Sequence, residues 1–230
     1  MIAIDEMIGV VHTYYPRGMA RNASGYASSE EHRRLVDARR KAGAENGLWR
    51  AFLRRLGEQF PEASVLNASL HLPTGNFDAA YSGKIVLSST LTLGFLVSFL
   101  MPYYVLHSAR VVEDLQARPV SLGRTRAVFK GNTCYLLPTW AAKLATLFLG
   151  AKEAPLTDDS PPQRIDVRFD FSPEEQPYAT WISGEIGTTW GFERMPPEVG
   201  RTIVPDVATD LCLLGEATLY DCLFADDWLR

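Results

Sequence analysis

The sequence predicts an α+β protein, with a mainly antiparallel sheet packed by N-terminal helices and by one or two short later helices. Two observations support this prediction. The stretch from Lys84 to Arg110 is the largest apolar block of the chain, and no Asp, Glu, Lys or Arg lies between its two ends. Before that block, residues 45–59 place apolar and charged side chains on opposite sides of a helix.

The apolar block has the period of a strand. Between residues 91 and 99, strictly apolar side chains fall on every second position, which is typical of a half-buried strand. Pro102 suits a bend between strands and would kink a helix. We therefore predict strands at about 83–99 and 103–113, joined at Met101-Pro102. Insertion into a membrane is the alternative, because the block exceeds the roughly 20 apolar residues that a spanning helix needs.

The elements before the block begin with Met7–Tyr15, whose β-branched and aromatic residues favour a strand that ends at Pro16. Ser28 or Ser29 then caps a charged helix that ends near Gly43, and Glu31 completes a capping box with Ser28. The amphipathic helix 45–59 follows. Ser64–Leu72 alternates and predicts a strand.

After the block, Arg126–Leu137 resembles a hairpin that turns at Gly131-Asn132. Pro138 opens a short helix that Gly150 ends. Residues 165–171 alternate as a half-buried strand, Tyr178–Ile186 predicts another strand, and Glu216–Trp228 predicts a short helix.

A chain of 230 residues accommodates one domain, and we predict a single α+β domain over residues 1–230. The Pro-rich and acidic stretch 154–163 is where a subdivision would fall. Three widely spaced cysteines, Cys134, Cys212 and Cys222, indicate reduced thiols. The first residues carry Asp5 and Glu6 and no basic region, unlike a secretory signal, so we expect a cytoplasmic protein.

The net charge of −4 divides unevenly along the chain. Residues 1–150 contain 17 Lys and Arg against 11 Asp and Glu, whereas residues 151–230 contain 6 against 16. An acidic segment of this kind repels nucleic acid and attracts a basic partner. The plainer interpretation is that solvated surface carries charges of either sign.

No motif for catalysis, phosphate binding or a resident cofactor stands out: the chain has no P-loop, no dinucleotide-binding glycine fingerprint, no HExxH and no G-x-S-x-G. An enzyme remains the alternative, either a hydrolase or a metal-dependent enzyme whose site assembles from distant strand residues. Three histidines on predicted strands, His12, His71 and His107, would be its zinc ligands. Cys–His catalysis and a carboxylate pair at Asp166 and Asp170 are further versions of this alternative.

The densest basic group lies on the two early helices and could bind phosphates. It consists of Arg33, Arg34, Arg39, Arg40, Lys41, Arg50, Arg54 and Arg55. Acidic residues such as Glu30, Asp37 and Glu58 are interleaved with it, so a solvated helix surface is the favoured interpretation.

The order of features resembles the immunity proteins of bacterial polymorphic toxin systems. More narrowly, the chain is similar to the α+β immunity family that accompanies toxins with a restriction-endonuclease-type nuclease domain. The resemblance is carried by HTYYPRG (His12–Gly18), by LWRAFLRRL (Leu48–Leu56) and by the strand-rich remainder. It implies a cytoplasmic, non-enzymatic protein without cofactor or metal that binds one protein toxin and blocks its active site or substrate channel.

Such an inhibitor would offer carboxylates to a basic nuclease surface, and opposite charges speed association. The candidate partner-binding residues lie in the acidic segment: Asp158, Asp159, Glu174, Glu175, Asp226 and Asp227. Candidate aromatic anchors are Tyr178, Trp181, Trp190 and Trp228, although packing in the core is the commoner fate of a tryptophan. Neither direct nucleic-acid binding nor a membrane partner is expected.

Overall fold

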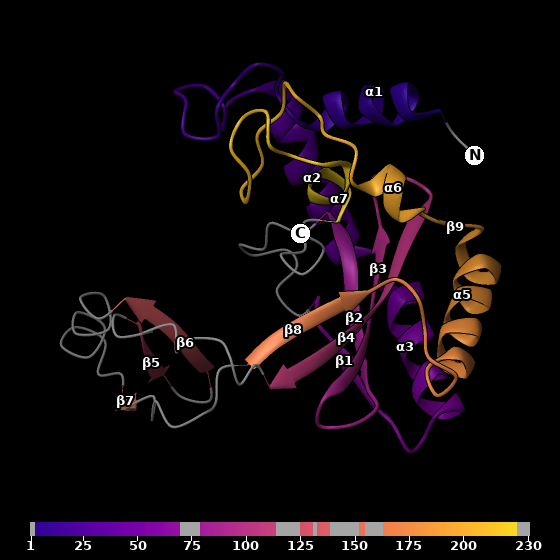
Figure 1. Ribbon diagram of the computed structural model, residues 1–230. Helices are drawn as coiled ribbons and strands as arrows, with labels where there is room; N and C mark the ends of the chain where they lie inside the picture. Colours follow the sequence, from indigo (N-terminus) through magenta and orange to yellow (C-terminus); the bar gives the residue numbers. More distant parts are fainter. Residues whose placement is uncertain are drawn as a thin grey trace. The chain divides into compact units, whose positions relative to one another are not determined.

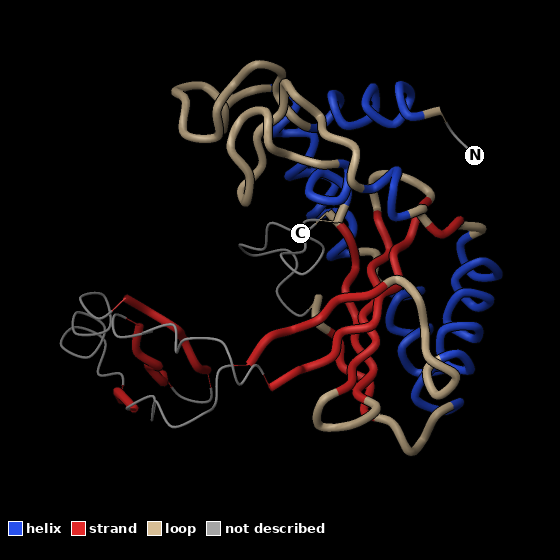
Figure 2. Tube along the Cα trace, viewed as in Figure 1, coloured by secondary structure: helices blue, strands red, loops and turns tan. Residues whose placement is uncertain are grey.

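A computed structural model of the chain describes residues 3–69, 79–113, 125–130, 133–138, 152–154 and 163–224, and between 112 and 165 it describes the backbone alone. The chain forms two compact units, one of residues 1–110 with 166–230 and one of residues 111–165. The first unit confirms the α+β prediction (Figures 1 and 2). Its helices are α1 (Ile4–Tyr14), α2 (Glu30–Ala44), α3 (Gly47–Gln59), α5 (Gln176–Trp190), α6 (Pro197–Gly200) and α7 (Leu219–Leu223).

The sheet has the order β1-β2-β3-β4-β8, and a short strand pairs with β4 in addition. Its strands are β1 (Ser64–Asn67), β2 (Ala80–Val86), β3 (Leu91–Ser98), β4 (Tyr103–Glu113), β8 (Gln163–Arg168) and β9 (Glu193–Arg194). Strands β1 to β4 pair antiparallel as successive neighbours, while β9 runs parallel to β4. Strand β1 is the edge of the sheet along this path, and its four residues include the half-exposed Leu66.

The apolar block is β-structure, as predicted, but it contains three strands where two were expected. The predicted strand 83–99 is wrong as one element, because β2 ends at Val86 and β3 begins at Leu91. The polar residues Ser88 to Thr90 lie in the turn between them, where the Thr90 amide donates to the Ser88 hydroxyl at 3.3 Å. Among the described residues, no helix is long and apolar enough to cross a membrane.

One face of the sheet is covered by α3 and α5, which lie side by side in Figure 1. Phe95 lies at the centre of this face, with ring centroids 5.6 Å from Phe52 and 5.8 Å from Trp49 of α3. Ile182 and Ile186 of α5 are fully buried in the same cluster. Burial of this many large side chains, at about 25 cal/mol per Å² of apolar surface, fixes α5 against the sheet.

The opposite face is covered by α1, α7 and the chain around them. Leu96, which alternates with Phe95, and Val105 of β4 point into this second core. The two faces therefore share one sheet, and both are buried over part of its length, as the apolar block predicts.

Hydrogen bonds and ion pairs join the first described segment of this unit to the last. The Tyr15 hydroxyl donates to the Cys222 carbonyl at 2.8 Å, across 207 positions of sequence. The Asp206 carboxylate lies 2.9 Å from Nε2 of His12 and accepts from Nε of Arg17 at 2.7 Å. Helix α1 thus rests on residues that are among the last in the described chain.

Two predicted strands are helices. Met7–Tyr15 is mostly α1, because Met7, Val11 and Tyr15 are four residues apart and share one buried side. Tyr178–Ile186 lies within α5 for the same reason, since Ala179, Ile182 and Ile186 form its buried stripe. In both segments the three- and four-residue spacing of the buried positions outweighs the preference of β-branched residues for strands.

The two early helices and the last one are confirmed as helices. Ser29 is the cap of α2, with its hydroxyl accepting from the His32 amide at 3.2 Å, and the helix ends at Ala44. The predicted capping box of Ser28 with Glu31 is wrong, because the Ser28 hydroxyl donates to the Gly25 carbonyl instead. The predicted helix 45–59 is α3. Within 216–228, helix α7 covers Leu219–Leu223, and its Asp221 is buried because it forms a capping box with Thr218.

The second unit contains β5 (Thr125–Lys130), β6 (Thr133–Pro138) and β7 (Lys152–Ala154). Antiparallel pairing of β5 with β6 confirms the predicted hairpin, and β7 pairs with β5 on the other side. The predicted helix after Pro138 lies outside the described residues, as does nearly all of the 154–163 stretch.

Candidate protein-binding site

The segment that leads into α5 is fixed by the side chain of Glu175. This residue is 3% exposed, and its Oε2 accepts from the Ser172 amide at 2.8 Å. The Ser108 hydroxyl of β4 also donates to the Glu175 carboxylate. Pro177, in the first turn, adds a backbone with a fixed φ that favours the start of a helix. The first turn of α5 is therefore held firmly against the sheet.

Burial alone raises the pKa of Glu175, but hydrogen bonds from Ser108 and Ser172 and the positive charge of Arg110 act against it. The net effect lowers the pKa of Glu175 below its usual value of 4.5. The carboxylate is consequently ionised at neutral pH and contributes a negative charge beneath this surface.

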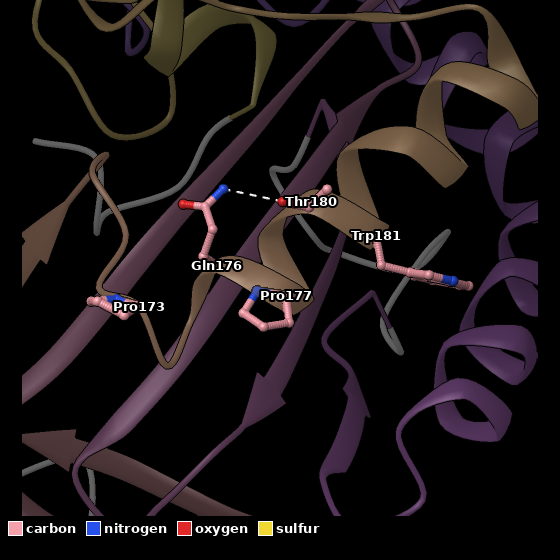
Figure 3. A pocket seen from close by; sticks show the side chains of 5 residues that line it. All are labelled: Pro173, Gln176, Pro177, Thr180 and Trp181. Atoms are coloured by element: carbon pink, nitrogen blue, oxygen red, sulfur yellow. Dashed lines mark hydrogen bonds between the residues drawn. The ribbon is translucent and has the colours of Figure 1, made fainter.

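An open apolar hollow of about 590 Å³ lies on the outer side of the first turns of α5. It is lined by Pro173, Gln176, Pro177, Thr180 and Trp181, which Figure 3 shows around the start of the helix. The Gln176 side-chain amide donates to the Thr180 hydroxyl at 3.1 Å, so these two polar groups at the rim bond to each other. Two prolines and an indole leave an uncharged surface open to solvent.

The floor of the hollow is aromatic and belongs to the core. The Trp181 ring lies 6.2 Å from the Phe52 ring of α3 and 5.9 Å from the Phe60 ring. Phe60 also packs against Tyr178, with ring centroids 4.4 Å apart. These contacts hold the aromatic side chains in one arrangement, which is the property that a binding surface needs to avoid an ordering cost.

A second, polar hollow of about 380 Å³ adjoins the first turn of α5. Its lining residues are Leu87, Ser88, Thr90, Leu91, Arg110, Glu174 and Tyr178. Arg110 donates to Glu174 at 3.1 Å, and the Tyr178 hydroxyl donates to Glu62 at 3.1 Å. Partial burial first, and then the hydrogen bond and charge of Glu62, raise the pKa of Tyr178.

The exposed face of α5 carries no charge along its length. Its fully exposed residues are Gln176, Pro177, Thr180, Gly184, Gly187 and Thr188. The one charged side chain of the helix, Glu185, turns aside to accept from Nε of Arg55 at 2.6 Å. No heavy atom lies within 4 Å of a Cβ placed at Gly184 or Gly187, so internal packing does not require either glycine.

Of the six predicted partner-binding carboxylates, the structure places only Glu174 on this surface. Glu174 is exposed, with 65% of its side chain accessible. The prediction that Glu175 contacts a partner needs correction, because its carboxylate is buried and accepts hydrogen bonds from Ser108 and Ser172. The other four lie outside the described residues: Asp158, Asp159, Asp226 and Asp227.

The predicted aromatic anchors divide in a similar way. Tyr178 and Trp181 line the two hollows. Trp190 is half-buried, with its ring 5.4 Å from that of Phe52, and Trp228 lies outside the described residues. The first two therefore remain candidates for contact with a partner.

Two of the three histidines of the enzyme alternative lie within the described residues. His12 lies on α1 beside Asp206, and His107 is 1% exposed within β4, while His71 lies outside the described residues. No group of three or more His, Cys, Asp or Glu in the described part of the chain could hold a metal ion. Cys212 and Cys222 are buried thiols, and burial raises the pKa of Cys222 well above its usual value.

Asp166 of the predicted carboxylate pair and several arginines of the basic group form ion pairs within the described structure. Asp166 accepts from Arg168 at 2.6 Å, as expected for a solvated strand face. Arg40 pairs with Asp37 at 2.7 Å on α2. Arg39 does not belong to a solvated helix surface, because its side chain is only 10% exposed. Its Nη2 lies 3.8 Å from Oδ2 of Asp210.

Sequence reasoning missed the lining of the apolar hollow: Pro173, Gln176, Pro177 and Thr180. The available signal was the pair of prolines four residues apart, followed by a helical stripe at 179, 182 and 186 that leaves uncharged residues on the outer side. Interpreting 178–186 as a strand concealed this arrangement. Searches of protein-family models, curated proteins and solved structures find no match to this chain.

Proposed function

We propose that this protein is a non-enzymatic immunity protein that binds and neutralises one cognate bacterial toxin, a nuclease in the version that the sequence resemblance favours. The observation that carries the proposal is the apolar hollow of Pro173, Pro177 and Trp181, next to the polar hollow that contains the exposed carboxylate of Glu174. Binding surfaces of this kind combine an aromatic and apolar centre with a polar rim.

The rigidity of the surface around the hollow supports the proposal. The hollow is built on a helix whose first turn is fixed by Glu175 and whose aromatic floor is fixed by α3. A partner therefore meets a surface that needs little ordering on binding, which favours tight association. A toxin held there would have its active site or substrate channel covered by this protein.

The test is co-expression with the product of the neighbouring gene, followed by purification of the complex and an assay of toxin activity. We expect a stable complex in which the toxin is inactive. Thr180→Arg places a long charged side chain in the hollow and should weaken the complex by about 100-fold or more, as loss of a central contact does.

Thr13→Arg on α1 is the matched control, because Thr13 is also an exposed helical threonine and lies outside both hollows. It should leave the complex unchanged, and circular dichroism should show that both variants are folded. A neighbouring product without toxic activity and without affinity for this chain would count decisively against the proposal.

A further inference from the structure

We infer that the surface at the start of α5 recognises a protein segment in which a Lys or Arg adjoins an apolar side chain. The inference deepens the proposed function and rests on it for the identity of the partner. It concerns the chemistry of the contact, which follows from the two hollows and from the charges around them.

The apolar hollow supplies one half of the recognition. Pro173, Pro177 and Trp181 present hydrocarbon and ring surface, and the Gln176 side-chain amide donates to the Thr180 hydroxyl at the rim. An apolar side chain placed on this surface would remove it from water at about 25 cal/mol per Å². The hollow therefore favours an apolar side chain.

The charges supply the other half. Among the described charged groups close to Tyr178, the carboxylates of Glu62, Glu174 and Glu175 are opposed by the guanidinium of Arg110. Glu175 is ionised because its pKa is lowered, so the local charge is −2 even after the Arg110–Glu174 pair is formed. A cationic side chain of a partner is attracted to this region, and the phosphates of a nucleic acid are repelled.

The two halves are adjacent because they share an aromatic floor. The ring centroid of Phe60 lies 4.4 Å from that of Tyr178 and 5.9 Å from that of Trp181. The Tyr178 hydroxyl in turn donates to the Glu62 carboxylate. Tyr178 lines the polar hollow and Trp181 the apolar one, three residues further along the same helix. One short stretch of a partner chain can therefore place its apolar group and its cation together.

The experiment uses the full chain and two synthetic peptides of opposite charge, acetyl-Lys-Leu-Lys-Phe-amide and acetyl-Glu-Leu-Glu-Phe-amide. Each is titrated over the millimolar range while the Trp181 indole N–H signal is followed by NMR, after assignment with Trp181→Phe. We expect a saturable shift with the basic peptide and an affinity for the acidic peptide that is at least about fivefold weaker.

Two variants separate charge from shape. Glu62→Lys combined with Glu174→Lys should reverse the preference between the peptides, and Thr180→Arg should abolish the shift with both. Glu30→Lys on α2, where Glu30 pairs with Arg34, is the matched charge control and should change neither titration.

Equal affinity for the two peptides, shifts confined to residues outside 173–181, or no shift across the range would overturn the inference. These outcomes are distinguishable from failure of the proposed function. A toxin complex that forms and withstands Thr180→Arg would retain the function while removing this surface from it.

Discussion

The imidazole ring of His107 lies over Gly94, its cross-strand neighbour on β3. A Cβ at position 94 would stand 2.3 Å from Nε2 and 2.4 Å from Cε1 of His107, closer than real side chains approach. Because His107 is 1% exposed, the ring has little space into which it can move. The missing side chain at Gly94 is therefore what allows a histidine in this part of the sheet.

Gly94→Ala should destabilise the protein by about 1–3 kcal/mol, as overpacking of a full core does. Chemical denaturation measures the change. His107→Ala in the same chain should recover much of the loss, because it removes the clashing ring. Gly57→Ala is the matched control, since nothing lies within 4 Å of a Cβ at that helical glycine. Equal effects at positions 94 and 57 would contradict the prediction.

Stability should fall as the pH drops from about 6.5 to 4. Burial, with a smaller effect of Lys84, lowers the pKa of His107 from 6.5 to about 4. In that window the unfolded chain takes up a proton that the folded chain does not. The free energy of unfolding therefore falls, by up to about 3 kcal/mol in total. His107→Phe should flatten the slope in urea denaturation measured at several pH values.

The carboxyl groups of Glu175 and Asp206 act at the acidic end of this window and below it. The pKa of Glu175 and of Asp206 is lowered from 4.5 and 3.8 respectively, so their contribution to stability is present above these values and is lost at lower pH. A slope between pH 6.5 and 4.5 that persists in His107→Phe would show that another group is responsible.

Removing the carboxylate of Glu175 should cost about 1–3 kcal/mol, because the Ser172 amide and the Ser108 hydroxyl lose their acceptor. Thermal denaturation of Glu175→Ala measures this loss. Ser108→Ala combined with it should cost less than the two single changes together, since the orphaned hydroxyl is removed as well. Glu174→Ala, on the exposed neighbour, should change stability by less than about 0.5 kcal/mol.

Gly184→Ala and Gly187→Ala should each stabilise the protein by about 0.5–1 kcal/mol, because alanine is the better helix former and each position has open space for a Cβ. Denaturation midpoints test this. Gly191→Ala is the contrasting variant and should destabilise, because Gly191 ends the helix at a φ of 69°. If Gly187→Ala stabilised the chain but weakened the proposed toxin complex, the uncharged face of α5 would be part of the contact.

Much of the fold could be predicted from patterns that span a few residues. The period of two at Leu91, Leu93 and Phe95 predicts β3, and Ser29 at the head of a charged run predicts the start of α2. The break between β2 and β3 was missed, although Ser88 to Thr90 are the polar residues that a turn prefers. A short polar run inside an apolar block therefore marks the end of one strand and the start of the next.

The errors came from segments whose composition and spacing disagree. Residues 7–15 contain valine, threonine and tyrosine, which favour strands, yet Met7, Val11 and Tyr15 recur at four-residue intervals and are the residues that the core buries. Tertiary packing overrides local preference in such segments. The candidate site was only partly predictable, because the burial of Glu175 depends on Ser108, which is 67 residues away.

The bond between Tyr15 and Cys222 has a consequence for the order of events on the ribosome. Helix α1 emerges early, but the side chains that cover Met7 and Val11 include Leu219, Leu223 and Phe224, which are translated about 200 residues later. Until then, Leu35 of α2 is available from the same cluster but the C-terminal part of the native cover is missing, and exposed apolar surfaces attract chaperones or each other. Slowing translation before residue 219 should therefore lower the soluble yield more than slowing it afterwards.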